Sequence, residues 1–156
     1  MEALNCLSQV AEFHQTFGHP ILPSPLIPSK ERTDLRVSLL TEELKELQQG
    51  IDNSDIVEIA DALCDIQYVL AGAILEFGLG DRFKELFDEV QRSNMSKACE
   101  DEEEASETVV KYESDGIECY YKQIGDKFVV YRKSDNKVMK NIYYSSAKLS
   151  SIITNL

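Results

Sequence analysis

Six carboxylates lie at helical spacing in two short stretches of the chain: Glu42, Glu43 and Glu46, then Glu58, Asp61 and Asp65. On a helix, the first trio falls within about 100° and the second within about 60°. Like charges at these spacings weaken an isolated helix by ~0.2–0.5 kcal/mol per pair. A cation held between the two faces would offset that repulsion. Because every donor is an oxygen, we expect a hard divalent cation, Mg²⁺, with Mn²⁺ as a substitute.

Two other interpretations of the acidic trios are open. They would also arise as two solvated faces of an acidic protein that needs no ligand. A ferritin-like di-iron bundle buries glutamates between helices as well, but it requires Glu-x-x-His pairs. The only histidines, His14 and His19, lie outside the acidic stretches. The residue types therefore favour the magnesium site over the di-iron site.

The spacing of apolar residues predicts the elements that hold these carboxylates. Four helices are expected, at residues 2–17, 29–49, 55–77 and 81–96. The short connections Gly50–Ser54 and Gly78–Gly80 favour antiparallel neighbours, so a four-helix bundle is the natural packing. Between the first two helices, the prolines of Pro20–Pro28 exclude a helix interior and predict an extended segment.

The pattern changes after Lys97. The acidic run at 100–104 is expected to be a solvated loop. Runs of β-branched and aromatic residues then predict a small β-meander of three short strands, Thr108–Tyr112, Ile117–Gln123 and Lys127–Arg132. Lys137–Lys140 adds an extended piece and Ala147–Thr154 a last short helix. We therefore expect a mainly α protein, with an all-α core at 1–99 and a β-containing tail at 100–156 packed on the same domain.

Composition limits the partners and the compartment. The formal charge of −12 argues against a nucleic acid polymer or an anionic membrane as partner. The apolar run Ala60–Leu79 is interrupted by charged residues, which predicts a core helix and no membrane span. The four cysteines are scattered and are expected to be reduced thiols. Residues 1–10 lack a basic start and a continuous apolar stretch, so we expect no signal peptide and a cytoplasmic protein.

The acidic residues resemble the EExxE…ExxD signature of the all-α nucleoside triphosphate pyrophosphohydrolases, which include MazG-like enzymes, dimeric dUTPases and phosphoribosyl-ATP pyrophosphohydrolases. The signature is carried by Glu42-Glu43-x-x-Glu46 and Glu58-x-x-Asp61, and Ile59–Ile66 is similar to the family's IADALADI helix. Glu89–Lys97 is similar to an EVHRSNMSK segment of a phosphoribosyl-ATP-pyrophosphohydrolase-like branch. The tail Tyr131–Lys140 is similar to that branch's YREDGKVLK ending.

The chain also departs from the family pattern. Eleven residues separate Glu46 from Glu58, at or just below the short end of the usual gap. Gln91 stands where the branch often has histidine. The stretch at about 108–132 resembles an insertion relative to the shortest members, and this insertion puts the transfer of their lid and oligomer geometry to this chain in doubt.

The resemblance implies an enzyme that cleaves the α–β phosphoanhydride of a nucleoside triphosphate to a monophosphate and pyrophosphate, in housekeeping of the nucleotide pool. It implies Mg²⁺ ligation by four carboxylates: Glu43, Glu46, Glu58 and Asp61. It gives Glu42 and Asp65 one of two roles, ligation of a further ion or orientation of the attacking water. It assigns four residues to the nucleotide: Asn94, Lys97, Lys140 and His14. It also implies a homodimer or a dimer of dimers. Two alternatives are hydrolysis of phosphoribosyl-ATP and a non-catalytic helical module for dimerisation or metal binding.

Overall fold

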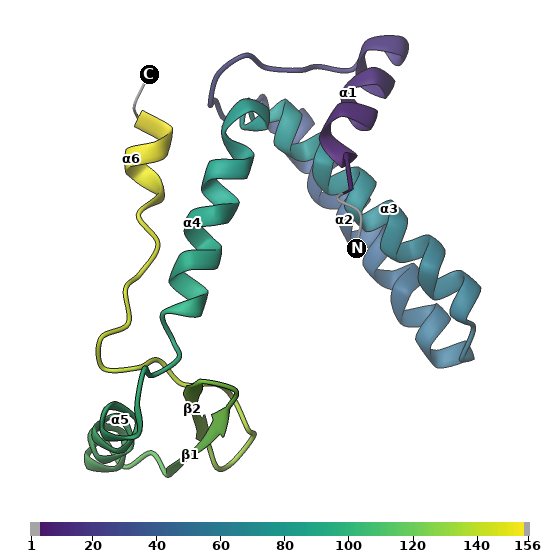
Figure 1. The fold of residues 1–156 in the computed structure, drawn as a ribbon. Helices are drawn as coiled ribbons and strands as arrows, with labels where there is room; N and C mark the ends of the chain where they lie inside the picture. The colour runs from purple at the N-terminus through teal and green to yellow at the C-terminus, as the bar shows by residue number, and fades with distance from the viewer. Residues whose placement is uncertain (1–3, 155–156) are drawn as a thin grey trace. The chain divides into compact units, whose positions relative to one another are not determined.

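The computed structural model describes residues 4–154, and the chain divides between Phe83 and Lys84 into two compact units. The first unit contains α1 (Cys6–Phe17), α2 (Lys30–Asn53), α3 (Ile56–Glu76) and the 3₁₀ turn η1 (Gly80–Arg82). The second follows from α4 (Phe83–Met95) through α5 (Glu102–Ser114), β1 (Cys119–Ile124), β2 (Lys127–Arg132) and α6 (Leu149–Thr154) (Figure 1). The predicted mainly α fold with a small sheet and a short C-terminal helix is confirmed. The predicted boundary at 99/100 stays a prediction.

In the first unit, α2 and α3 form an antiparallel pair, and α1 packs against α3 (Figure 1). The apolar contacts of α1 with α3 centre on buried Val10, Ala71 and Leu75. Of the predicted first helix at 2–17, residues 2 and 3 lie outside the described residues, and α1 begins at Cys6. Because α4 belongs to the second unit, the packing of all four predicted helices as one bundle stays a prediction.

The second helix was predicted to stop before Gly50, but α2 continues to Asn53. Gly50 serves close packing: a Cβ there would lie 3.0 Å from the backbone nitrogen of Ile59 on α3. The residue that caps the end of the helix is instead Ser54, which adopts a left-handed conformation with φ 55°. Asp55 then caps α3 by accepting hydrogen bonds from the amides of Val57 and Glu58.

The proline-rich segment is extended as predicted and is fixed to the end of α3 by backbone hydrogen bonds. The amide of Leu22 donates to the Leu75 carbonyl at 3.0 Å, and that of Leu26 to the Phe77 carbonyl at 3.1 Å. Gly78 lies where the two segments meet, with φ 66°. A Cβ on Gly78 would lie 1.9 Å from the Ser24 carbonyl oxygen, which is backbone and cannot rotate away.

We therefore expect Gly78→Ala to destabilise the protein by more than the ~1–2 kcal/mol cost of a left-handed non-glycine residue. Gly116→Ala is the matched control, because Gly116 has φ 77° but no atom lies within 4 Å of the place that its Cβ would occupy. Urea unfolding of both variants separates the cost of the clash with Ser24 from the cost of the left-handed backbone conformation. Equal losses in the two variants would contradict the close approach at Ser24.

One predicted strand and one predicted loop are wrong. Thr108–Tyr112 is part of helix α5, and the acidic run at 100–104 contributes the first turn of that helix. Asp101 caps α5 by accepting from the amide of Glu104 at 2.9 Å, and the glutamates of the first turn complement the helix dipole. The β-propensity of the valines was outweighed by the burial of one face of the helix, where Ala105 and Thr108 are fully buried.

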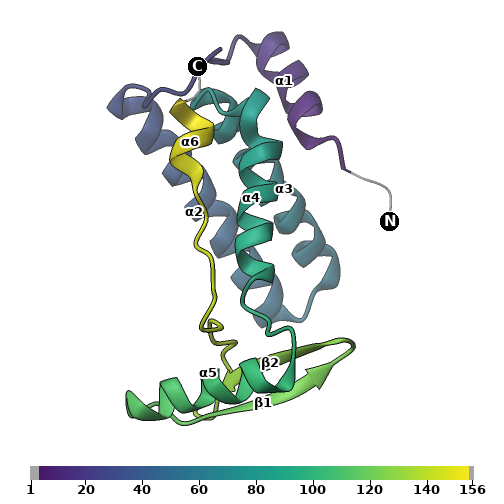
Figure 2. The ribbon, with the colours of Figure 1, turned by 60° about the vertical axis from the view of Figure 1, so that its left-hand side comes forward.

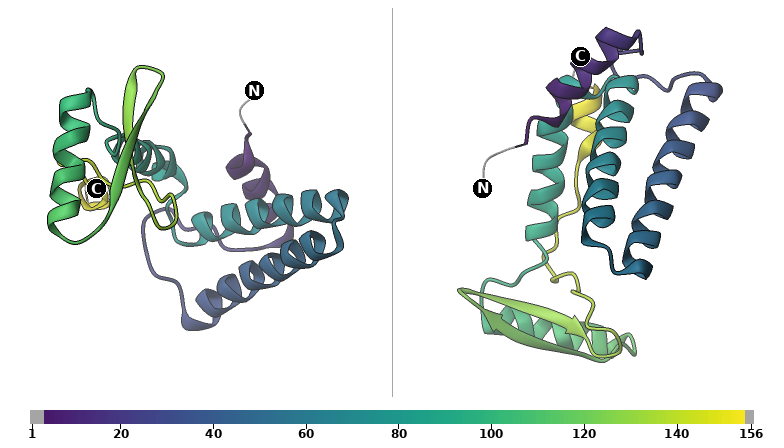
Figure 3. Two further views of the ribbon diagram at one scale, coloured as in Figure 1. Left: turned by 90° about the horizontal axis from the view of Figure 1, so that it is seen from below. Right: turned by 90° about the vertical axis from the view of Figure 1, so that its right-hand side faces the viewer.

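The other two strands form an antiparallel hairpin instead of a three-stranded meander. β1 and β2 pair from Cys119–Arg132 to Ile124–Lys127, which leaves a two-residue turn with Gly125 at φ 64°. Val138 adds an isolated bridge to Tyr131, as the predicted extended piece requires. One face of the hairpin packs on α5 around five buried residues, Cys99, Ala105, Cys119, Val130 and Met139 (Figure 2). Figure 3 shows the same helix lying along the hairpin from two further sides.

Between residues 4 and 154, no single helix is both long and apolar enough to cross a membrane. Within these residues, α3 and the helical segment Gly80–Met95 reach the length and apolar composition of a membrane span only when they are taken together, and they are bent by 109° where they meet.

Candidate active site

The two acidic trios lie on the antiparallel pair α2 and α3. The turn at Ser54 and the close approach at Gly50 set the register of the two helices. Glu43 of α2 is thereby brought among the carboxylates of α3. Its Oε2 atom is buried and accepts no hydrogen bond within the described chain.

The surroundings of Glu43 are electrostatically unfavourable for its charge. Burial raises the pKa of the Glu43 carboxyl, and the charges of Glu46, Asp65, Glu42 and Asp61 raise this pKa further. All of these neighbours belong to the set that the sequence singled out. Four of the other five carboxylates therefore act on one half-buried side chain, whose buried oxygen has no partner in the described chain.

The sixth carboxylate, Glu58, lies in the first turn of α3 and has a different neighbour. The side-chain amide of Asn53 donates to Glu58 Oε2 at 3.4 Å. The predicted role of Glu58 as a metal ligand stays a prediction. Glu42 and Glu46 are exposed and line a shallow hollow along α2 with four polar neighbours, Ser38, Thr41, Lys45 and Gln49.

Within the part of the chain that the structure describes, no three His, Cys, Asp or Glu side chains converge into a ready-made metal site. The residues nevertheless fit a hard divalent cation. The donor set is entirely oxygen, and the buried oxygen of Glu43 needs a positive partner. Mutual repulsion keeps such side chains apart, and a cation would draw them together. The individual ligands of such a cation stay a prediction.

A second cluster of charged residues is buried between α1, α2 and α3. Glu76 of α3 is 1% exposed and accepts hydrogen bonds from both Arg32 and Arg36 of α2. Arg36 Nη2 also lies 3.3 Å from His14 Nε2 on α1. A Cβ at position 72 would lie 2.8 Å from Arg36 Nη1, so glycine in α3 makes room for the guanidinium. The cluster thus ties all three helices together.

His14, which the family resemblance assigned to the nucleotide, has protein partners for both ring nitrogens. Nδ1 lies 2.9 Å from the Pro20 carbonyl, which can only accept, so Nδ1 carries the proton and Nε2 accepts from Arg36. The ring is 2% exposed. A small cavity of about 220 Å³ adjoins it, lined by apolar and aromatic side chains that include Phe13, Leu39 and Tyr68. Contact of His14 with a nucleotide stays a prediction.

His14 should make stability depend on pH. Burial lowers the pKa of His14 below its ordinary value of 6.5; the bond to Pro20 opposes this and nearby Arg36 reinforces it. Between the folded pKa and pH 6.5, the unfolded chain therefore binds more protons than the folded chain. We expect the free energy of unfolding to fall by up to about 1 kcal/mol between pH 7 and pH 5.5. Urea titrations of wild type and His14→Gln measure this, and an identical pH slope in the two proteins would contradict it.

The predicted phosphate-side residues lie in the second unit. Lys97 Nζ donates to Asn94 Oδ1 at 2.8 Å, at the end of α4. Lys140 Nζ lies 4.4 Å from the centre of the Tyr144 ring, and the Tyr144 hydroxyl shares a 3.0 Å hydrogen bond with Ser93. Arg92, a further basic residue of this segment, is paired with Glu89. The roles of Asn94, Lys97 and Lys140 toward a substrate stay predictions.

Sequence reasoning did not find the buried cluster of Glu76, Arg32 and Arg36. One signal was present: Glu76 is the single charged residue of the apolar run 66–80, and the two arginines are four residues apart on α2. A carboxylate in such a run requires a buried cation as partner. Which cation it meets depends on how the helices pack.

Comparison with known proteins shows the family of the chain. The family model described as phosphoribosyl-ATP pyrophosphohydrolase matches residues 10–94, or 85 of the 156 residues. The matched span includes all six carboxylates and ends at Asn94. The chain therefore belongs to the phosphoribosyl-ATP pyrophosphohydrolase family, and it is a pyrophosphohydrolase, a hydrolase that acts on phosphoanhydride bonds.

One curated relative resembles the chain over nearly its whole length. It is the "Uncharacterized protein L479" of Acanthamoeba polyphaga mimivirus, which is 23% identical over an alignment 235 residues long. The alignment covers 92% of this chain and 94% of that protein. The similarity thus extends past α4 into the rest of the second unit.

Proposed function

We propose that the protein hydrolyses the α–β phosphoanhydride of a nucleoside or deoxynucleoside triphosphate, in a Mg²⁺-dependent reaction that releases a monophosphate and pyrophosphate. The observation that carries the proposal is the buried Glu43 oxygen, which has no partner in the described chain and lies among four further carboxylates. Bound divalent cations would neutralise the phosphates and stabilise charge that develops on them. Glu43, Glu46, Glu58 and Asp61 are the proposed ligands.

In the proposed reaction, a water oxygen forms a bond to one phosphorus of the α–β linkage while the bridging P–O bond breaks. Glu42 or Asp65 accepts the proton of that water and orients it. Asn94, Lys97 and Lys140 contact phosphate oxygens, because ammonium and amide groups donate to them. The biological role consistent with this chemistry is removal of a surplus or non-canonical nucleotide.

A second candidate substrate is phosphoribosyl-ATP, which the matching family model favours by its description. The same bond would be cleaved in it, so the carboxylates would act identically. The reaction is tested by pyrophosphate release from the eight common (d)NTPs, dUTP and phosphoribosyl-ATP, each with Mg²⁺, Mn²⁺ or EDTA. Metal-dependent release from one or a few identifies the substrate. No release from folded protein, and no metal-dependent thermal stabilisation by non-hydrolysable analogues, would favour the non-catalytic helical module.

The attacked phosphorus can be assigned in the same assay. Hydrolysis in ¹⁸O-labelled water places the label in the monophosphate if water attacks the α-phosphorus, and in pyrophosphate if it attacks the β-phosphorus. Mass spectrometry of the two products distinguishes them.

We also propose that the chain self-associates through α2 and α3. Val37, Leu44 and Ile51 recur every seven residues on α2, and each is more than half exposed. Ile56 and Leu63 begin a similar series on α3. Exposed apolar residues at this spacing form a seam that a second helical surface covers, and a second copy of the chain is the proposed occupant.

Light scattering should then give twice the chain mass of 17.7 kDa. We expect Val37→Lys combined with Ile51→Lys to halve the measured mass. Val110→Lys is the control, since Val110 is 65% exposed on α5 of the other unit. A wild-type protein that is monomeric at ~100 µM would contradict the proposal, because obligate interfaces remain associated at such concentrations.

A further inference from the structure

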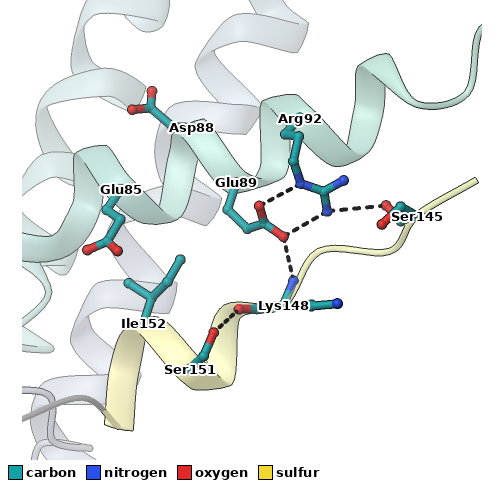
Figure 4. A pocket seen from close by; sticks show the side chains of 8 residues that line it. All are labelled: Glu85, Asp88, Glu89, Arg92, Ser145, Lys148, Ser151 and Ile152. Carbon is teal, nitrogen blue, oxygen red and sulfur yellow. Dashed lines mark hydrogen bonds and ion pairs between the residues drawn. The ribbon is translucent and has the colours of Figure 1, made fainter.

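One face of α4 is joined by hydrogen bonds to a segment more than fifty residues later in the chain. Figure 4 shows Glu89 and Arg92 of α4 facing Ser145 and Lys148 of the C-terminal segment. Arg92 donates to Glu89 through Nε at 2.7 Å and Nη2 at 2.8 Å. Two parallel bonds of this kind fix the guanidinium in one orientation.

The paired side chains then bind backbone groups of the C-terminal segment with opposite polarity. Arg92 Nη2 also donates to the carbonyl of Ser146 at 3.2 Å and more weakly to that of Ser145 at 3.5 Å. Glu89 Oε1 accepts from the amide of Lys148 at 2.8 Å. We call this arrangement the 89/92 clamp. It requires a cation at position 92, which donates to the backbone carbonyls, and an anion at position 89, which accepts from the backbone amide.

The same face of α4 carries Ser93, and Ser96 just after the helix continues the attachment. Ser96 Oγ accepts from the Ser145 amide at 3.0 Å, and Ser93 shares its hydrogen bond with the Tyr144 hydroxyl. At 100° per residue, Glu89, Arg92, Ser93 and Ser96 fall within about 100° of one another. The segment that resembles EVHRSNMSK thus uses its Arg and both Ser residues internally.

Two of the remaining residues of that segment, Asn94 and Lys97, are the ones proposed to meet phosphate. Across residues 4–154, the side chains of Asn94 and Lys97 hydrogen-bond to each other and to no other side chain, and Asn94 is exposed. Tyr144, held at Ser93, packs against the ammonium of Lys140 at 4.4 Å. Ser93 therefore holds Tyr144, whose ring lies against the ammonium of Lys140, and Ser93 directly precedes Asn94.

We propose that the Glu89–Arg92 pair is a positioning device, which clamps residues 145–148 onto α4 and so keeps the Tyr144 ring against the ammonium of Lys140. Lys140 is one of the three proposed phosphate contacts, with Asn94 and Lys97. This inference rests on the proposed function, in which those three residues bind the substrate phosphates. Arg92 itself is a positioning residue and touches no phosphate.

The charge of Glu89 persists over the working range of pH. The hydrogen bonds from Arg92 and from the Lys148 amide lower the pKa of Glu89 to about 2. The clamp therefore keeps its ion pair at every pH at which the enzyme would be assayed.

Steady-state kinetics on the full chain test the proposal. Loss of positioning removes binding that is common to the ground and transition states, so Arg92→Ala should raise KM about tenfold with kcat nearly unchanged. Arg92→Lys should recover part of the affinity, because it retains one bond to Glu89. The control is Lys84→Gln, which breaks the 2.5 Å ion pair of Lys84 with Asp88 on the same helix. An unchanged KM in Arg92→Ala would overturn the proposal.

Two further variants separate positioning from simple stabilisation of α4. If Arg92 acts through Lys140, the double variant Arg92→Ala/Lys140→Ala should be no worse than the poorer single variant. Additive losses would overturn the proposal. In the exchanged pair Glu89→Arg/Arg92→Glu, the ion pair is restored but its polarity toward the backbone of 144–148 is reversed. KM should therefore stay high, and a wild-type KM would show that only the helix ion pair matters.

Failure of the proposed function can be distinguished from failure of the clamp. If the wild-type protein hydrolyses no nucleotide, binding of inorganic triphosphate by calorimetry replaces KM. A dissociation constant raised about tenfold in Arg92→Ala would support the clamp even without hydrolysis. An equal constant in the two proteins, or no binding by the wild type, would overturn it.

Discussion

Replacing Glu43 by glutamine is expected to abolish metal-dependent pyrophosphate release while making the metal-free protein more stable. Glutamine keeps the shape of the side chain but removes the charge that a divalent cation requires. We expect activity to fall at least about 100-fold, since a ligand of the reacting centre is lost. The matched control is Glu31→Gln, an exposed glutamate in the first turn of the same helix.

The gain in stability follows from the raised pKa of Glu43. Because the folded pKa lies above the ordinary value of 4.5, the folded state binds a proton more readily than the unfolded state. Stability therefore falls as the pH rises from 4.5 through the folded pKa, and at neutral pH the charged group opposes folding. Removing that charge should raise the melting temperature in EDTA by roughly 2–4 °C, equivalent to ~1 kcal/mol.

Magnesium should reverse the order of the two proteins. A cation that binds only the folded wild type stabilises it by mass action, whereas Glu43→Gln loses most of that gain. Calorimetric melting of both proteins in EDTA and in 10 mM MgCl₂, roughly a saturating concentration for millimolar sites, measures the crossover. A variant that kept full activity, or lost stability in EDTA, would refute the assignment of Glu43.

The acidic site and the first unit could be anticipated because their information is local. Helical spacing placed each trio on one face, and turn residues indicated that α2 and α3 are neighbours. Gly50 misled for a physical reason: the same residue type ends helices and permits close packing. The raised pKa of Glu43 could not be predicted, because it depends on the register between α2 and α3. The spacing of apolar residues within each helix does not determine that register.

The second unit was harder to predict because its local signals conflict. Thr108, Val109 and Val110 favour a strand, whereas Asp101 followed by Glu104 has the spacing of a helix cap. Burial of Ala105 and Thr108 decides for the helix. The 89/92 clamp joins residues more than fifty positions apart through backbone carbonyls and an amide. Side-chain patterns cannot reveal such contacts, since any residue offers them.

The largest loss of stability should come from Glu76→Gln, which unpairs a buried guanidinium. Glu76 is 1% exposed, and Arg36 is 7% exposed with its Nε atom already lacking a partner in the described chain. Removing one partner of a buried ion pair typically costs ~3–5 kcal/mol, because the other charge stays desolvated. We therefore expect the melting temperature to fall by roughly 10 °C. The control is Asp34→Asn, which breaks an exposed pair with Lys30 on α2 and should cost under ~0.5 kcal/mol.

The double variant Glu76→Gln/Arg36→Met decides between loss of a pair and loss of packing. If the cost arises from the uncompensated charge of Arg36, removing that charge too should recover most of the stability, since apolar replacements of buried pairs are often neutral. Arg32 needs no replacement, because its side chain is 27% exposed and reaches water. A double variant no more stable than Glu76→Gln would show that the cluster acts through shape.

The pH dependence gives a second, independent test of Glu76. Burial alone would raise the pKa of this carboxyl, but the hydrogen bonds from Arg32 and Arg36 outweigh burial and hold it below 4.5. The stabilisation is thus fully present above pH 4.5 and is lost as the pH falls through the folded pKa. The difference between wild type and Glu76→Gln should accordingly be constant from pH 8 to pH 5 and shrink in stronger acid. A difference that persisted undiminished there would mean that the charge of Glu76 does not hold the three helices together.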